Sequence, residues 1–189
     1  MLEYINGELN AASCGMALLG SLAPLLEKAA RLCLASLEAG GKIMFCGNGG
    51  SAAQSQHLAA ELVGRYKMER RALAALSLTV DTSDITAIGN DYGYDDIFRR
   101  QLEGVGRRGD VLVGLSTSGN SANVVKAFEL ARASGMAVVA LTGEGGGRMA
   151  SLADVCLAVP SRETNHIQEM HLVLGHILCG LLEREVGRA

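Results

Sequence analysis

The stretch "CGNGGSAAQSQHLAAELVGRY", from Cys46 to Tyr66, joins an apolar run to a helix-like pattern through a cluster of glycines. Four more apolar runs follow along the chain, separated mostly by segments with helical character. The five runs are "KIMFC" (42–46), "LAALSL" (73–78), "DVLVGL" (110–115), "MAVVAL" (136–141) and "DVCLAV" (154–159). Their apolar residues do not alternate with polar ones, which is typical of strands buried on both faces. The pattern therefore predicts an α/β fold with a parallel sheet and crossover helices.

Both ends of the chain are predicted to be helical. Met16–Leu37 is rich in helix-forming residues and is followed by Gly40-Gly41, and the first forty residues carry no strand signal. Asn165–Val186 repeats apolar residues at helical spacing. Because no repeat or linker divides the chain, we expect a single domain over residues 1–189. Within it, residues 1–40 form an N-terminal helical extension that packs on the domain and on a subunit interface.

Composition excludes several classes of protein. No apolar run approaches the ~18 uninterrupted residues of a membrane span, and the N-terminus is acidic where a signal peptide would be basic. The five cysteines are scattered without a C-x-x-C pair, which is typical of buried, reduced thiols in a cytoplasmic protein. The net charge of −3 offers no footprint for nucleic acid. We therefore expect a cytoplasmic protein that binds neither membranes nor nucleic acid.

The glycine loop Gly47–Ser51 lies between a predicted strand and a predicted helix. Its backbone can approach a ligand closely, and the free N–H groups of the helix N-terminus favour a phosphate or another anion. A plain tight turn is the alternative, with Ser51 as the helix N-cap and Gln54 completing a capping box. The loop also matches a dinucleotide fingerprint formally. That reading is disfavoured because the first acidic residue after the second predicted strand is Asp81, well beyond the required spacing.

Two further loops carry polar groups. The serine loop "STSGNS" (116–121) follows the third predicted strand, and its hydroxyls and the following helix N-terminus could cradle a phosphate; a polar turn is the alternative. The absence of a P-loop lysine argues against a nucleoside triphosphate. Asn90-Asp91 follows a short apolar piece, so a turn and a contact to sugar hydroxyls are both open.

Histidines gather in two places. His57 and Glu61 are four residues apart on one helix face, a spacing that suits zinc but also an ordinary surface pair. The other three histidines all fall in the final predicted helix, where His176 lies two turns beyond Gln168. We interpret His166 and His171 as ordinary residues of that helix's polar face. Gln168 has an alternative of its own, reaching back to the helix start if Asn165 is the N-cap.

Four motifs in order together resemble the sedoheptulose 7-phosphate isomerases, or phosphoheptose isomerases, of the SIS (sugar isomerase) superfamily. They are the opening stretch, "AIGNDYGYDDIF", "GDVLVGLSTSGNSANV" and "IQEMHLVLGHILCGLLE", and the resemblance runs from about Gly41 to Glu183. It implies a three-layer αβα sandwich with a five-stranded parallel sheet, flavodoxin-like in arrangement, assembled as a homotetramer. It also implies aldose–ketose isomerisation of sedoheptulose 7-phosphate to glycero-manno-heptose 7-phosphate, through an enediol, for lipopolysaccharide heptose.

The same resemblance implies the site residues. One zinc ion per subunit would be held by His57, Glu61, Gln168 and His176. Substrate would be bound by Asn48, Gly49, Gly50, Glu61, Asn90, Asp91, Ser116, Thr117, Ser118, Ser121 and Gln168. The chemistry of the reaction adds the catalytic roles, since an enediol mechanism needs a positioned carboxylate to move a proton between neighbouring carbons. We assign that base to Glu61, and acid–base work on the oxygens to His176.

Two alternatives belong to the same superfamily. One is a non-catalytic regulator that binds the bacterial replication initiator, which lacks equivalents of Glu61 and His176. The other is an isomerase of a different sugar phosphate, such as arabinose 5-phosphate; those usually carry regulatory domains for which this chain has no room.

Overall fold

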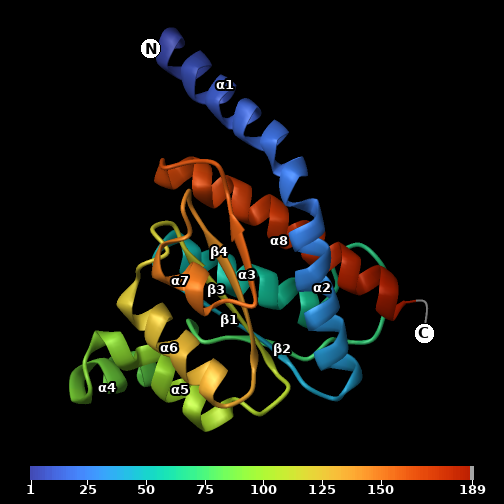
Figure 1. The fold of residues 1–189 in the computed structure, drawn as a ribbon, viewed down its shortest axis with the longest axis vertical. Coiled ribbons are helices and arrows are strands. Elements are labelled where there is room, and N and C mark those ends of the chain that lie inside the picture. Colours follow the sequence, from blue (N-terminus) through green and yellow to red (C-terminus); the bar gives the residue numbers. More distant parts are fainter. Residues whose placement is uncertain (188–189) are drawn as a thin grey trace.

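Five parallel strands form one sheet in the order β2-β1-β3-β4-β5 (Figure 1), in a computed structural model that describes residues 1–187. The strands are β1 (Ile43–Gly47), β2 (Ala75–Ser77), β3 (Val111–Ser116), β4 (Ala137–Thr142) and β5 (Val155–Ala158). All five predicted strands are confirmed. β2 is shorter than expected because Leu73 donates its N–H to Leu62 of the preceding helix rather than to a strand.

Helices cover both faces of the sheet, which confirms the predicted αβα sandwich. The α-helices are α1 (Leu2–Leu18), α2 (Ala23–Glu38), α3 (Gly50–Val63), α4 (Thr82–Asp91), α5 (Ile97–Val105), α6 (Ala122–Ala133), α7 (Gly147–Leu152) and α8 (Thr164–Val186). Short 3-10 turns, η1 (Leu19–Leu22) and η2 (Tyr94–Asp96), lie between α1 and α2 and between α4 and α5. Successive strand residues point to opposite faces, so Phe45 packs with α2, α3 and α8 while Met44 packs with α5 and α6.

The sheet has a switch point between β1 and β3. These neighbouring strands pair with Phe45 opposite Val113. The helix after β1, α3, packs on one face, whereas the helix after β3, α6, packs on the other. The two loops therefore diverge at the carboxyl edge of the sheet, which is where open α/β sheets bind ligands.

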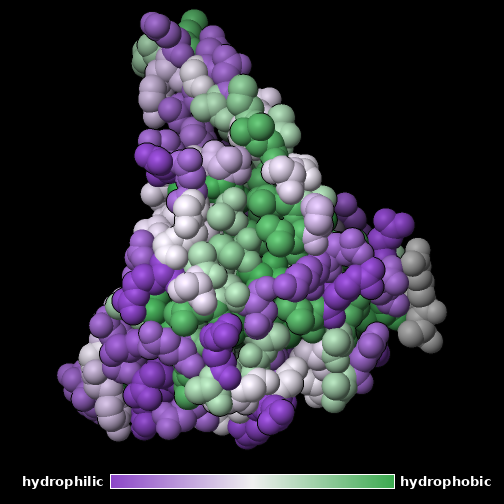
Figure 2. Space-filling view, viewed as in Figure 1, coloured by the Kyte–Doolittle hydropathy of each residue, from purple (hydrophilic) through white to green (hydrophobic). Residues whose placement is uncertain are grey.

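The N-terminal extension is helical from Leu2 to Glu38, within the predicted range 1–40, so helix begins well before the segment Met16–Leu37 that carries the strongest helical pattern. α2 packs on α8 and the sheet, but α1 projects away from the domain and buries none of its residues (Figure 1). Hydrophobic surface runs from α1 down towards α2 and α8 (Figure 2). By length and composition alone, the continuous helical stretch Leu2–Glu38 could cross a membrane, although the same test is passed by helices of soluble proteins.

Candidate active site

A pocket of about 280 Å³ lies at the switch point. Its walls come from the β1–α3 loop, the β3–α6 loop and the start of α8; the lining residues are Asn48, Gly49, Gly50, Ser51, Leu115, Ser116, Thr117, Ser121, Thr164 and Gln168. Three helices, α3, α6 and α8, therefore begin at this pocket. No Lys or Arg of the described chain lines it. The positive ends of the three helices and the hydroxyls of the lining are features that favour an anion.

The glycine loop has the predicted position but not the predicted cap. α3 begins at Gly50, and its N-cap is Gly49, whose φ of 56° favours glycine. Ser51 lies inside the first turn, is buried, and makes no capping hydrogen bond, so the expected Ser51 cap is wrong. The amide of Gln168 packs closely on Gly50, since a Cβ at this position would lie 2.6 Å from Oε1 of Gln168. The loop is thus shaped for close approach of the α8 side chain and of a ligand.

The serine loop contributes most of its predicted residues to the pocket. Ser116, Thr117 and Ser121 line it, and the Ser116 and Ser121 hydroxyls are 2.9 Å apart. Ser118 is exposed and is not part of the lining; its hydroxyl accepts the N–H of Asn120. Three hydroxyl-bearing side chains at a helix start form the donor set that a phosphate prefers.

Asn90 and Asp91 lie outside the pocket lining. They end α4, are exposed, and are joined by a hydrogen bond of 2.8 Å between Asn90 Nδ2 and Asp91 Oδ1. Both belong to the segment that leads into η2.

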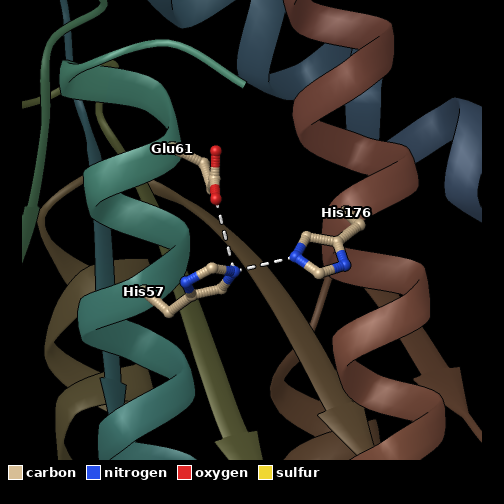
Figure 3. A group of neighbouring side chains, drawn as sticks. All are labelled: His57, Glu61 and His176. Carbon is tan, nitrogen blue, oxygen red and sulfur yellow. Dashed lines mark hydrogen bonds and ion pairs between the residues drawn. The ribbon is translucent and has the colours of Figure 1, made fainter. Parts of the chain in front are cut away.

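His57, Glu61 and His176 converge between α3 and α8 (Figure 3). The Nε2 atoms of the two histidines are 2.8 Å apart, and Nε2 of His57 is 3.4 Å from Oε1 of Glu61. One ligand atom from each residue lies within 4.8 Å of the others. Two imidazoles and a carboxylate at this spacing are a donor set that suits zinc. His176 of α8 therefore faces the predicted His57–Glu61 pair of α3.

The turn after α3 supports this cluster. The Tyr66 ring stacks on His176 with centroids 5.4 Å apart and planes 16° apart. Burial, with His57 and Lys67 nearby, holds the pKa of His176 below its ordinary value despite the opposing effect of Glu61. The neutral imidazole that metal binding and proton uptake require is therefore favoured.

Gln168, the fourth predicted ligand, lies over Gly50 in the pocket, two helical turns before His176. No hydrogen bond within residues 1–187 occupies its side-chain amide, while its main-chain oxygen accepts from Gln54. The proposed alternative for Gln168 is wrong: α8 begins at Thr164, its N-cap is Glu163, and Asn165 instead bonds Glu8.

The other two histidines of α8 are not polar-face residues, and that interpretation is wrong. His171 is fully buried, neither ring nitrogen has a well-formed partner, and burial lowers its pKa to about 4. His166 is largely buried and faces Glu169 at 3.0 Å and Glu8 of α1 at 3.6 Å. The hydrogen bond to Glu169 raises the pKa of His166.

Several site residues were missed from the sequence. Thr164 opens α8 at the pocket, and Tyr66 packs against His176. The only feature of the sequence that could have indicated Thr164 is its position, as a hydroxyl residue directly before the predicted final helix. Nothing in the local sequence indicates that Tyr66 meets a helix more than a hundred residues away.

Comparisons with known proteins identify the family and the fold. The SIS domain family model matches residues 12–143. The chain is 62% identical over 186 residues to the phosphoheptose isomerase of Akkermansia muciniphila, with 98% of both chains covered. It is 60% identical to that of Rhodospirillum rubrum, with 92% of both covered. The structure of a phosphoheptose isomerase from Neisseria gonorrhoeae matches with a TM-score of 0.92 at 45% identity, covering 97% of this chain and 98% of the other.

Proposed function

The chain belongs to the SIS domain family, within which it is a phosphoheptose isomerase, and on that premise we propose that the switch-point pocket and the His57–Glu61–His176 cluster together form its active site. The substrate is sedoheptulose 7-phosphate and the product is glycero-manno-heptose 7-phosphate, a precursor of lipopolysaccharide heptose. The observation that carries the assignment of the site is the convergence of the three cluster residues on the same helix pair, α3 and α8, that borders the pocket.

The spacing of pocket and cluster suits a long sugar phosphate. His57 is seven residues beyond Gly50 on α3, which is about 10 Å along a helix. A second hollow of about 230 Å³, lined by Ala53, Gln54, His57 and Leu172, lies on the intervening stretch. A phosphate in the serine loop leaves the far end of an open-chain sugar near the cluster. That end carries the carbonyl and hydroxyl that an aldose–ketose isomerase interconverts.

The cluster fits one zinc ion per subunit. His57, Glu61 and His176 would supply three ligands. Gln168 is the proposed fourth, although its amide lies over Gly50 in the pocket and would have to turn towards the cluster. When bound, zinc polarises the carbonyl and hydroxyl oxygens of the substrate and stabilises enediolate charge.

Proton transfer falls to two side chains of the cluster. Glu61, partly buried, takes the proton from one carbon beside the carbonyl and returns it to the neighbouring carbon. His176 exchanges protons with the oxygens and assists opening of the sugar ring. Because ligation to a metal would lower the basicity of a carboxylate, Glu61 would hold the zinc ion and act as base at different stages of the cycle.

Replacing Glu61 tests this mechanism. Glu61→Gln removes the base while keeping the shape of the side chain, so turnover of sedoheptulose 7-phosphate, followed by NMR, is expected to fall by at least about 10³-fold. Circular dichroism and the melting temperature should stay close to wild type. Glu103→Gln, on the exposed face of α5, is the matched control and should keep full activity. Near-normal turnover by Glu61→Gln would remove Glu61 from the mechanism.

The regulator alternative has no supporting observation here, because the two residues that distinguish the enzyme both lie in the cluster. The same assay also decides between sugar phosphates. Comparing kcat/KM for sedoheptulose 7-phosphate with that for arabinose 5-phosphate tests whether the longer chain is preferred, as the spacing of the two hollows predicts.

The projecting α1 supports assembly into a homotetramer. A stripe at helical spacing, here called the α1 stripe, consists of Leu2, Ile5, Leu9, Ala12 and Met16. It leads into an apolar groove of about 530 Å³, between the α1–α2 junction and α8. An unburied apolar helix beside an apolar groove is the arrangement expected when α1 of a second copy fills the groove.

The proposed location is the cytoplasm, without membrane insertion. The apolar character of Leu2–Glu38 is then explained by contact between subunits rather than with lipid. The cysteines also fit a reducing compartment: all five are unpaired, and burial raises the pKa of the Cys33, Cys46 and Cys179 thiols to about 12.

A further inference from the structure

Asn48 lies in the glycine loop, at the edge of the pocket, in a closed set of hydrogen bonds. Its Nδ2 donates to Oδ1 of Asn123 at 2.9 Å, and its Oδ1 accepts from Nδ2 of Asn123 at 2.8 Å. The two amides therefore face each other as a reciprocal pair. Asn123 belongs to the first turn of α6 and is buried, with 2% of its surface exposed.

The main chain fixes which way both amides point. Oδ1 of Asn123 accepts the backbone N–H of Val124 at 2.9 Å, and a backbone N–H can only donate. The amide nitrogen of Asn123 must then face Asn48, so Asn48 must turn its oxygen towards Asn123 Nδ2. The oxygen and nitrogen of an amide side chain are often hard to tell apart. Here the backbone N–H of Val124 fixes the orientation of Asn123, and Asn123 in turn fixes that of Asn48.

Tyr94 completes the set from another segment. Its hydroxyl donates to Oδ1 of Asn48 at 3.0 Å, although the residue is 60% exposed. Tyr94 begins η2, and η2 is also tied to α6 through the ion pair of Asp96 with Lys126, whose Oδ2 and Nζ are 2.8 Å apart. The hydroxyl is therefore presented by an anchored turn rather than by a free loop.

With both hydrogen bonds to its oxygen in place, Asn48 has one N–H group left without a partner in residues 1–187. We propose that Tyr94 and Asn123 are positioning residues that lock the Asn48 amide so that this N–H donates to an oxygen of the sugar. The inference rests on the proposed isomerase function and deepens it. It explains the use of an amide at position 48, since a carboxylate there would have no proton to donate.

A double-mutant cycle tests the role of Tyr94. Tyr94→Phe keeps the ring and removes only the hydroxyl, so kcat/KM for sedoheptulose 7-phosphate is expected to fall about fivefold, as for one neutral hydrogen bond. In an Asn48→Ala background the same change is expected to have no further effect, because Tyr94 acts through Asn48. Tyr92→Phe is the matched control: Tyr92 is also exposed, its ring lies under Arg100, and its hydroxyl has no hydrogen bond within residues 1–187.

The outcomes separate this inference from the proposed function. An inactive wild-type protein would overturn both, whereas an active wild type with an unchanged Tyr94→Phe variant overturns the positioning role alone. An equal loss in the Asn48→Ala background also overturns it, because Tyr94 would then act independently of Asn48. If Asn48→Ala turns over too slowly to measure, the same substitutions are made in the Glu61→Gln protein. The cycle then compares dissociation constants of sedoheptulose 7-phosphate, measured by calorimetry.

Discussion

At the scale of single residues, His57 and His176 cannot both be protonated at Nε2. With these two atoms 2.8 Å apart, the gap between them has room for at most one proton, which one nitrogen donates and the other accepts. Glu61 lies on the same side, 3.4 Å from His57. The two imidazole nitrogens and the carboxylate thus face one shared space, which either a proton or a metal ion can occupy.

Metal analysis tests that interpretation. We expect close to one equivalent of zinc per chain in the purified protein, and a loss of at least about tenfold in affinity for zinc in His57→Ala and in His176→Ala. His166→Ala, in the same α8 helix but outside the cluster, should retain the metal. Elemental analysis after dialysis against a weak chelator measures all three variants. Unchanged zinc in both cluster variants would rule out the site.

His171 predicts a pH dependence of stability. Burial lowers its pKa to about 4 from an unfolded value of about 6.5, so below pH 6.5 the unfolded chain binds a proton that the folded chain does not. Its contribution to stability is therefore complete at neutral pH and is lost as the pH falls towards 4. Between pH 7.5 and 5 it amounts to about 2 kcal/mol.

Urea denaturation at both pH values measures this effect. His171→Leu should show a smaller decrease in unfolding free energy than wild type over the same interval. If the two proteins lose stability equally, His171 is not the group responsible.

At the scale of elements, the turn that follows α3 is held to α8 by a buried ion pair. Arg70 Nε lies 3.6 Å from Oε1 of Glu183, and the two side chains are only 3% and 1% exposed. Glu183 also accepts the backbone N–H groups of Tyr66 and Lys67, at 3.1 and 2.8 Å. Burial alone would raise the pKa of Glu183, but the backbone hydrogen bonds and the charge of Arg70 outweigh that effect. The pKa of Glu183 is therefore lowered, and the carboxylate is ionised. The pair thereby positions Tyr66 against His176.

Removing one charge should be costly. Glu183→Gln leaves the Arg70 charge buried without its partner, and we expect a loss of about 3–5 kcal/mol in unfolding free energy. Glu27→Gln is the control, because Glu27 forms an exposed pair with Arg31 within α2 and should cost less than about 1 kcal/mol. Chemical denaturation compares the two variants. Equal small losses would show that the buried pair does not hold the turn.

At the scale of the whole molecule, α1 is helical over 17 residues, yet none of them is buried in its own chain. Only its end, at Met16, packs against the core. An isolated helix of this length is marginal in water, so α1 needs packing partners that the single chain does not provide. The α1 stripe and the groove beside α8 supply complementary apolar surfaces for such a partner.

A charged residue in the α1 stripe should therefore disrupt assembly without unfolding the domain. Ile5→Glu is expected to shift the mass measured by size-exclusion chromatography with light scattering from tetramer to smaller species. Asn10→Glu, on α1 but outside the α1 stripe, should remain tetrameric. Two results contradict the proposal: a wild-type monomer in detergent-free buffer, or recovery of the wild type only in the membrane fraction.

Several features of this protein are determined by the sequence alone. The unbroken apolar runs predict buried parallel strands, and a loop at the end of each strand must lie at the same edge of the sheet. The glycine and serine loops could therefore be placed near one another, because local periodicity and the direction of the strands suffice for that inference.

Only the tertiary structure decided how α8 returns to the site. His176 meets His57 across 119 positions of chain, and the start of the same helix brings Thr164 and Gln168 to the pocket. Helical spacing is identical for an exposed and a buried residue, so it could not reveal that His171 is buried. The position of the α3 N-cap at Gly49 rather than Ser51 likewise became visible only in the structure, where Ser51 is buried inside the first turn. Each of these outcomes is fixed by contacts between distant segments, which no local pattern encodes.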